Sequence, residues 1–258
     1  MMGTLVKQEL YKLTHKKGTW LAIVFMVLVQ VGFAGLRLKY PHFMPLSNLI
    51  MNGYIGGLLV LFIMIASCAS TIAMEFQYGT IKQLLYRQYY RSQVFVSKLI
   101  VLVLQLVVLQ VIASGVSFLL TIGLFPKFDW QQTVVGGHTW IEQYGLGLAG
   151  NLLMMVMLLS VVVLLATWFK TNAAAIATGF IGYFVIQVAG SLILLLIQRW
   201  EWLKWNPFTM LLIGSQMVAP KTYSTLTHLD TGVMAWCTFG YTVLFTLIAY
   251  LSFRRRSV

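Results

Sequence analysis

Six long stretches without a charged residue constrain the fold of this chain more than any other feature of its sequence. They lie at about residues 18–36, 49–74, 99–125, 143–169, 171–197 and 233–253. A helix needs roughly 20 apolar residues to cross the hydrocarbon core of a membrane. A crossing segment must be helical because lipid offers its backbone no hydrogen-bond partners. The sequence therefore predicts an all-α integral membrane protein with six transmembrane helices in one domain, residues 1–258.

The composition agrees with a membrane location. The chain is 59% hydrophobic and only 9% charged, whereas about a quarter of the residues of a soluble domain are charged. The first apolar run is longer than the core of a secretory signal, so we expect it to remain as the first span.

The distribution of Lys and Arg predicts the orientation. With the N terminus in the cytosol, the inner segments hold twelve of the 18 cationic residues. When the acids are included, the inner side carries +10 and the outer side +2. Because cytosolic segments of membrane proteins are enriched in Lys and Arg, we expect both termini in the cytosol. The net charge of +12 therefore requires no nucleic-acid partner.

The start of the chain, residues 4–16, has an amphipathic pattern. Its apolar residues recur at helical spacing and its lysines point elsewhere. This pattern predicts a helix that lies along the inner membrane surface. The alternative is that these residues are only the frayed start of the first span.

A charged segment, residues 75–98, separates the second and third runs. Gly79 is suited to end one helix, and Thr80 with Gln83 fits the capping pattern of another. We therefore expect a short helix at about 81–89. Three cations of the segment, Arg87, Arg91 and Lys98, are then expected at headgroup level, against lipid phosphate or an acidic protein surface. The alternative is a solvated loop whose charges only set the topology.

The expected outer loop at residues 198–232 contains an apolar run of its own, residues 208–219. The run is too short to span a membrane. It predicts a short helix in the outer leaflet, with Asn206 as its N-cap and Pro207 as its first residue. The alternative is an amphipathic helix on the surface, and the sequence does not separate the two.

The six apolar runs contain polar but no ionisable side chains of the Asp, Glu, Lys, Arg or His type. The notable ones are Gln30, Asn52, Gln105, Gln110, Asn151 and Gln187. These residues either line a substrate pathway or form hydrogen bonds between helices, and we favour the hydrogen bonds.

Several motifs of catalytic proteins are absent from the sequence. It has no GxxxxGK[ST] phosphate loop, no HExxH zinc pair and no GxSxG nucleophile motif. His42, His138 and His228 share the expected outer side but have no acid or Cys at ligand spacing. We therefore expect neither an enzyme nor a metal or cofactor in this chain, and a partner must supply any chemical energy.

The start LVKQELYKL, together with Glu75, the pair Gly79 and Thr80, and the later Arg91 and Lys98, resembles the permeases of type-2 ATP-binding-cassette exporters. The resemblance extends over the whole chain. It implies that residues 4–16 form a connector helix and that residues 75–98 contain a coupling helix. The ATPase-coupling residues that it implies are Glu75, Tyr78, Gly79, Thr80, Lys82, Arg87 and Arg91.

The resemblance also implies partners and a location. A separate ATPase would bind ATP and Mg, and two permease subunits and two ATPases would form the working unit in a bacterial plasma membrane. Family members of this type export drugs, antimicrobial peptides or toxins. We hypothesise that rigid second and third spans carry the motion of the coupling segment to a pathway between two permeases. The alternatives are a self-contained carrier or channel, and a structural or sensory membrane protein.

Overall fold

The computed structural model describes residues 2–42, 44–78, 90–134 and 137–255. In these residues the regular structure is helical, and the single bridged pair Thr133 and Thr139 forms no strand. Six of the described segments are long and apolar enough to cross a membrane. The predicted all-α membrane fold with six spans is thus confirmed. The chain divides into two compact units, Met1–Ser67 with Leu84–Asp129, and Cys68–Gln83 with Trp130–Val258.

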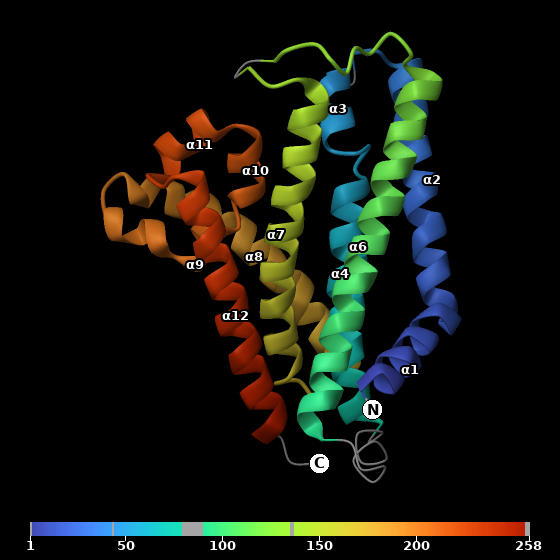
Figure 1. Ribbon diagram of the computed structural model, residues 1–258, viewed down its shortest axis with the longest axis vertical. Helices are drawn as coiled ribbons and strands as arrows, with labels where there is room; N and C mark the ends of the chain where they lie inside the picture. Colours follow the sequence, from blue (N-terminus) through green and yellow to red (C-terminus); the bar gives the residue numbers. More distant parts are fainter. Residues whose placement is uncertain (1, 43, 79–89, 135–136, 256–258) are drawn as a thin grey trace. The chain divides into compact units, whose positions relative to one another are not determined.

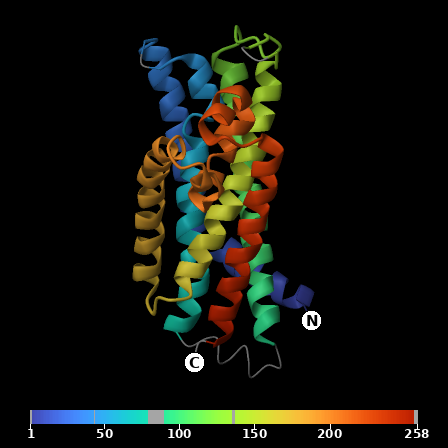
Figure 2. The ribbon, with the colours of Figure 1, turned by 90° about the vertical axis from the view of Figure 1, so that its left-hand side faces the viewer.

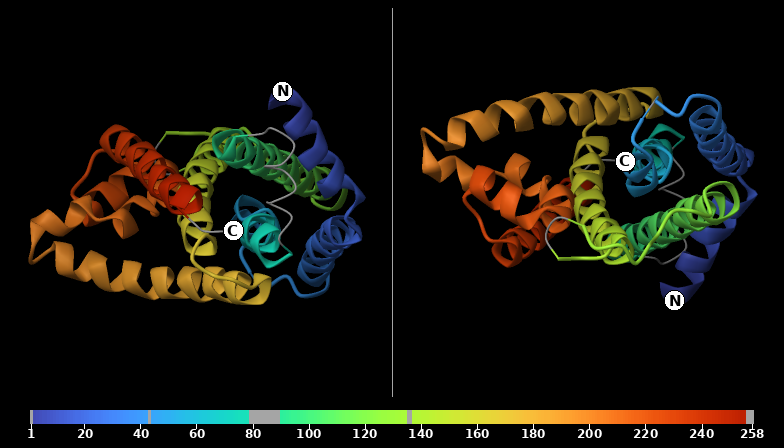
Figure 3. Two further views of the ribbon diagram at one scale, coloured as in Figure 1. Left: turned by 90° about the horizontal axis from the view of Figure 1, so that it is seen from below. Right: turned by 90° about the horizontal axis from the view of Figure 1, so that it is seen from above.

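The first unit is built around one long helix. It contains α1 (Met2–His15), α2 (Lys17–Lys39), α3 (Leu46–Met51), the start of α4 (Gly56–Gln77) and α6 (Arg91–Leu124) (Figure 1). Both α1 and α2 pack against α6. The view from below shows α1 beside the start of α6 (Figure 3, left).

The start of the chain and the first span are separate helices. Lys16 lies between α1 and α2 with an extended backbone, at φ −77° and ψ 109°. The Trp20 indole nitrogen donates a hydrogen bond of 2.7 Å to the Thr14 carbonyl oxygen across this bend. The bend therefore has a side chain that stabilises it, and α1 is not the frayed first turn of α2.

The second predicted span is interrupted. We expected one helix over residues 49–74, but α3 ends at Met51 and α4 begins at Gly56. Between them, Gly53, Tyr54 and Ile55 have φ angles of +59°, +50° and +67°. A positive φ is unusual for residues other than glycine and rare for β-branched ones. The second span is therefore not one continuous helix, and its rigidity stays a prediction.

The second unit contains the remaining helices. They are α7 (Trp140–Ala166), α8 (Asn172–Ile197), η1 (Glu201–Trp205), α9 (Pro207–Met210), α10 (Ile213–Val218), α11 (Pro220–Thr227) and α12 (Thr231–Arg255). Figure 2 shows α7 and α12 side by side. One core cluster of this unit joins α7, α9, α10 and α12 through Met157, Met210, Ile213, Leu229 and Met234.

The apolar run at residues 208–219 forms two short helices, α9 and α10, instead of one. Asn206 caps α9 by accepting a hydrogen bond of 2.9 Å from the Phe208 amide, and Pro207 is the first helical residue, as predicted. The buried Gln216 of α10 donates to the Leu229 carbonyl and accepts from the Thr227 hydroxyl. Side chains of both short helices thus pack inside the unit.

Two glycines allow α10 to approach α7 closely. A Cβ atom at Gly150 of α7 would lie 2.8 Å from the Cα atom of Gly214 in α10. No real Cβ contact is that short, so the two backbones would have to separate. Close helix approach through small residues is common in membrane proteins.

We expect Gly150→Ala to destabilise the protein by about 1–3 kcal/mol, because the added methyl meets backbone atoms that cannot move aside locally. Gly145→Ala is the matched control, since a Cβ there would have no heavy atom within 4 Å. Thermal unfolding in detergent measures both changes. Equal midpoints for the two variants would contradict the close packing of α7 and α10.

Candidate functional site

A buried ion pair joins the amphipathic helix α1 to α6, whose first residues, 91–98, are the end of the charged segment. In α1 the buried residues are Leu5 and Glu9, which lie one turn apart on the same face. In the first turns of α6, Val94, Phe95 and Lys98 are buried. The helical repeat therefore places one acid and one cation on faces that meet, because α1 packs against α6.

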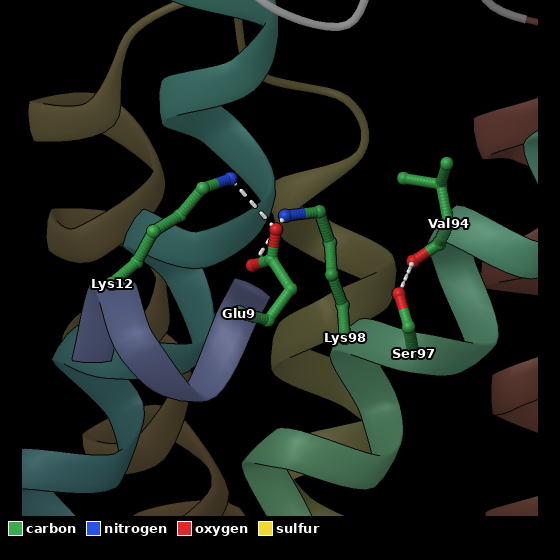
Figure 4. Close-up of polar contacts among 5 residues, drawn as sticks. All are labelled: Glu9, Lys12, Val94, Ser97 and Lys98. Carbon is green, nitrogen blue, oxygen red and sulfur yellow. Dashed lines mark hydrogen bonds and ion pairs between the residues drawn. The ribbon is translucent and has the colours of Figure 1, made fainter. Parts of the chain in front are cut away.

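The geometry of the cluster is shown in Figure 4. The Lys98 ammonium lies 3.0 Å from one carboxylate oxygen of Glu9, and the Lys12 ammonium lies 2.8 Å from the other. Lys98 is only 1% exposed, whereas the Lys12 side chain is half exposed. Each Glu9 oxygen thus receives a charge-assisted hydrogen bond, which is stronger than a neutral one.

The two ion pairs differ in energetic importance. Removing one partner from a buried pair costs about 3–5 kcal/mol, because a buried charge loses its counter-ion. A pair with a solvent-exposed lysine contributes about 0–1 kcal/mol. The contact between Glu9 and Lys98 is the ion pair that joins α1 to α6, because Lys12 belongs to α1 itself.

The charges around Glu9 keep it ionised. Burial by itself would raise the pKa of the Glu9 carboxyl. Attraction to Lys98 and the hydrogen bonds from Lys12 and Lys98 outweigh this effect, so that the pKa lies below the ordinary value of 4.5. The carboxylate is thus negatively charged at neutral pH.

The predicted coupling residues are only partly within the described chain. Gly79, Thr80, Lys82, Arg87 and the helix expected at about 81–89 lie outside the described residues. Glu75 and Tyr78 belong to the second unit, and Arg91 belongs to the first, where it is the first residue of α6. Their role in coupling stays a prediction.

Two of the predicted coupling residues differ in exposure. Tyr78 is 65% exposed and can contact a partner, whereas Glu75 is 6% exposed. Next to Glu75, Phe76 packs edge to face against Phe253 of α12, with ring centroids 5.3 Å apart. The Gln77 side-chain oxygen accepts a hydrogen bond of 2.8 Å from the Asn172 amide at the start of α8. Glu75 is thus buried, its two neighbours in the chain pack inside the second unit, and its role in coupling stays a prediction.

Lys98 contacts an acid of the protein, one of the two kinds of partner that the sequence predicted for it. Its side chain is buried against Glu9 because α1 covers it, and its position at headgroup level stays a prediction. Sequence reasoning missed Glu9 altogether as a site residue. The signal that could have found it is an acid four residues after Leu5, on the same apolar face of the predicted helix.

The polar side chains of the spans fall into two groups. Gln30 is 0% exposed and donates to Gly53, Ala113 and Ser117, while Gln105 accepts a hydrogen bond of 2.7 Å from Ser67. These two fit the expected hydrogen bonds between helices.

The remaining polar residues differ in exposure. Gln110 is buried, and Asn151 is half-buried. Asn52 and Gln187 are exposed, and each donates a hydrogen bond to a residue four positions earlier in the chain. A pathway-lining role for any of them stays a prediction.

Comparison with known proteins identifies one family. The sequence pattern of a family described as ABC-2 family transporter protein matches residues 5–187, which is most of the chain and includes Glu9, Lys98 and the charged segment. No curated protein sequence matches the chain.

We expect Glu9→Ala to weaken the docking of α1 on α6 by about 3–5 kcal/mol, because the carboxylate that compensates the buried Lys98 is lost. Hydrogen exchange of the amides of α1 measures the docking. The matched control is Gln8→Ala, since Gln8 is the exposed neighbour. Similar exchange in the two variants would show that the ion pair does not hold α1.

The docking should also depend on pH. A carboxyl whose pKa is lower in the folded state contributes stability above its ordinary pKa and loses it as the pH falls through the folded value. Protection of the α1 amides should thus be constant near neutral pH and fall only below about 4.5. In Glu9→Gln this acid-dependent step should disappear, and its persistence would assign the step to another group.

Proposed function

The chain belongs to the ABC-2 transporter family, a family of non-catalytic membrane permease subunits, and from this premise we propose that it forms the substrate pathway of an ATP-driven exporter. The family implies an ATP-binding-cassette ATPase as partner. That ATPase would bind ATP and Mg, since the sequence has no phosphate loop of its own. We further propose that the exporter resides in a bacterial plasma membrane with both termini in the cytosol, as the distribution of Lys and Arg predicts.

The observation that best supports this function is the buried ion pair of Glu9 and Lys98. In the proposed exporter the ATPase contacts the charged segment. Because α6 begins at Arg91, within that segment, a displacement of the segment moves α6. The ion pair then makes α1 move with α6, since separating them would take the counter-ion away from the Lys98 ammonium. A displacement of the charged segment would thus move both α6 and α1.

The proposed assembly contains a second permease. Three spans, α2, α8 and α12, have many large apolar side chains that are exposed in the single chain, among them Phe25, Leu195 and Leu247. In a membrane such faces are covered by lipid or by another membrane subunit. We propose that two permeases and two ATPases form the exporter and that the substrate is a drug, an antimicrobial peptide or a toxin of amphipathic character.

Charge reversal at the coupling segment tests the proposal. In permease and ATPase reconstituted together in liposomes, we expect Arg91→Glu to lower permease-stimulated ATP hydrolysis by about tenfold, the scale of a coupling free energy of about 1.4 kcal/mol. Glu75→Lys should do the same by disturbing the packing of the last turn of α4. Lys221→Glu is the matched control, because Lys221 is an exposed cation of the predicted outer loop.

Membrane insertion of every variant is checked by its yield in purified membranes. Normal permease-stimulated ATP hydrolysis in both Arg91→Glu and Glu75→Lys would contradict the assignment of the coupling segment. Transport of substrate by the purified chain without any ATPase would favour a self-contained carrier instead.

A further inference from the structure

The interrupted second span is fastened to two other helices by one buried side chain. The Gln30 amide nitrogen of α2 donates to the Gly53 carbonyl at 2.9 Å, to the Ala113 carbonyl at 3.0 Å and to the Ser117 hydroxyl at 3.1 Å. Gly53 belongs to the left-handed turn between α3 and α4, and the other two acceptors belong to α6. Only the nitrogen end of the amide can donate to these oxygens, so its orientation is set by its surroundings.

The space around the Gln30 amide has no room for another side chain. A Cβ atom at Gly56, the first residue of α4, would overlap the Gln30 amide nitrogen. A Cβ at Gly57, the next residue, would have no heavy atom within 4 Å. The glycine at position 56 thus allows α4 to begin directly against Gln30.

A second polar contact fastens the same turn to α6. The Tyr54 hydroxyl lies 3.1 Å from the Thr121 hydroxyl, and both residues are buried. Ala113, Ser117 and Thr121 follow one another at intervals of four residues and therefore share one face of α6. The left-handed turn, residues 53–55, is thus held on this face at two points.

The helix that receives these contacts is continuous, whereas the second span is not. Around the break, Gly53 donates to Ile50, Tyr54 donates to Leu49, and Gly56 donates to Gly53, which replaces the regular helical ladder. Helix α6 runs unbroken from Arg91 to Leu124 and binds α1 near its start through Lys98. A displacement therefore passes along α6 without interruption but meets a bend between α4 and α3.

We propose that Gln30 is a positioning residue for transport: it holds the left-handed turn on α6, so that α3 follows the movement of α6 and not that of α4. This inference rests on the proposed exporter function. In this inference α6, the third span, alone transmits motion along the first unit. Glu9 and Lys98 contact each other near one end of α6, and Gln30 contacts α6 toward the other end.

The first test measures whether Gln30 holds the turn. In the full-length permease, purified with its ATPase in nanodiscs, we expect Gln30→Leu to raise amide hydrogen exchange in the turn by about tenfold, because the buried contacts that protect it are lost. Gly56→Ala should act in the same direction and Gly57→Ala should not. Unchanged exchange in Gln30→Leu, or an equal rise in Gly57→Ala, would overturn the inference.

Two serines of α6 provide a milder matched pair. Ser114 and Ser117 each donate to the carbonyl four residues earlier, but Ser117 also accepts from Gln30. Ser117→Ala should raise exchange in the turn, whereas Ser114→Ala should leave it unchanged. This pair keeps the test decisive if Gln30→Leu does not fold.

The second test measures whether α3 follows α6 during the cycle. Asn48 of α3 is exposed, and Asn48→Cys is introduced where Cys68 and Cys237 are replaced by Ala, so that it is the only thiol. We expect its labelling rate by a membrane-impermeant maleimide to differ between the nucleotide-free complex and the complex trapped with ATP and vanadate. Gln30→Leu should remove this difference while ATP hydrolysis persists, and Ser114→Ala should retain it.

The outcomes separate the two proposals. A complex that hydrolyses ATP but shows no nucleotide-dependent labelling, or one in which Gln30→Leu keeps that difference, overturns the role of Gln30. A chain that binds no ATPase contradicts the exporter function, and hydrogen exchange then still decides whether Gln30 holds the turn.

Discussion

The structure depends on one constraint: hydrocarbon cannot form hydrogen bonds with the backbone, so the protein must satisfy those groups itself. Long uninterrupted helices meet this constraint on their own, and α6 and α7 are examples. Where a helix breaks, side chains supply partners. Gln30 donates to Gly53 at the break before α4, and Thr238 donates to Met210 at the break after α9. The break before α4 and the break after α9 are thus each accompanied by a buried polar residue.

The same low-polarity surroundings explain the arrangement of charge in the first unit. A buried ammonium such as that of Lys98 is tolerated only beside an anion, because burial of a single charge is costly. The chain provides Glu9 on the buried face of α1 and keeps Lys12 at the edge. An amphipathic helix that would otherwise contact α6 through apolar groups alone thus acquires a specific register on it.

Features set by local sequence could be predicted, and features set by distant residues could not. The six apolar runs, the capping by Asn206 and the helical start at Pro207 follow from composition and neighbouring residues. The left-handed turn could not be predicted, because the contacts that Gly53 makes with Gln30 and Tyr54 makes with Thr121 come from residues far away in the sequence. The burial of Lys98 was missed for the same reason. A cation at the end of an apolar run ordinarily indicates a headgroup, and its partner lies far away in the sequence.

The sequence separations of these contacts have a consequence for biogenesis. The bond from Lys98 to Glu9 spans 89 residues, that from Gln30 to Ser117 spans 87, and that from Tyr54 to Thr121 spans 67. All three need α6, which is synthesised after α1, α2 and α3. Until that helix leaves the ribosome and enters the bilayer, Glu9 has no Lys98 to bind and the turn has nothing to hold it. Insertion of the third span is thus the step that completes the first unit during translation.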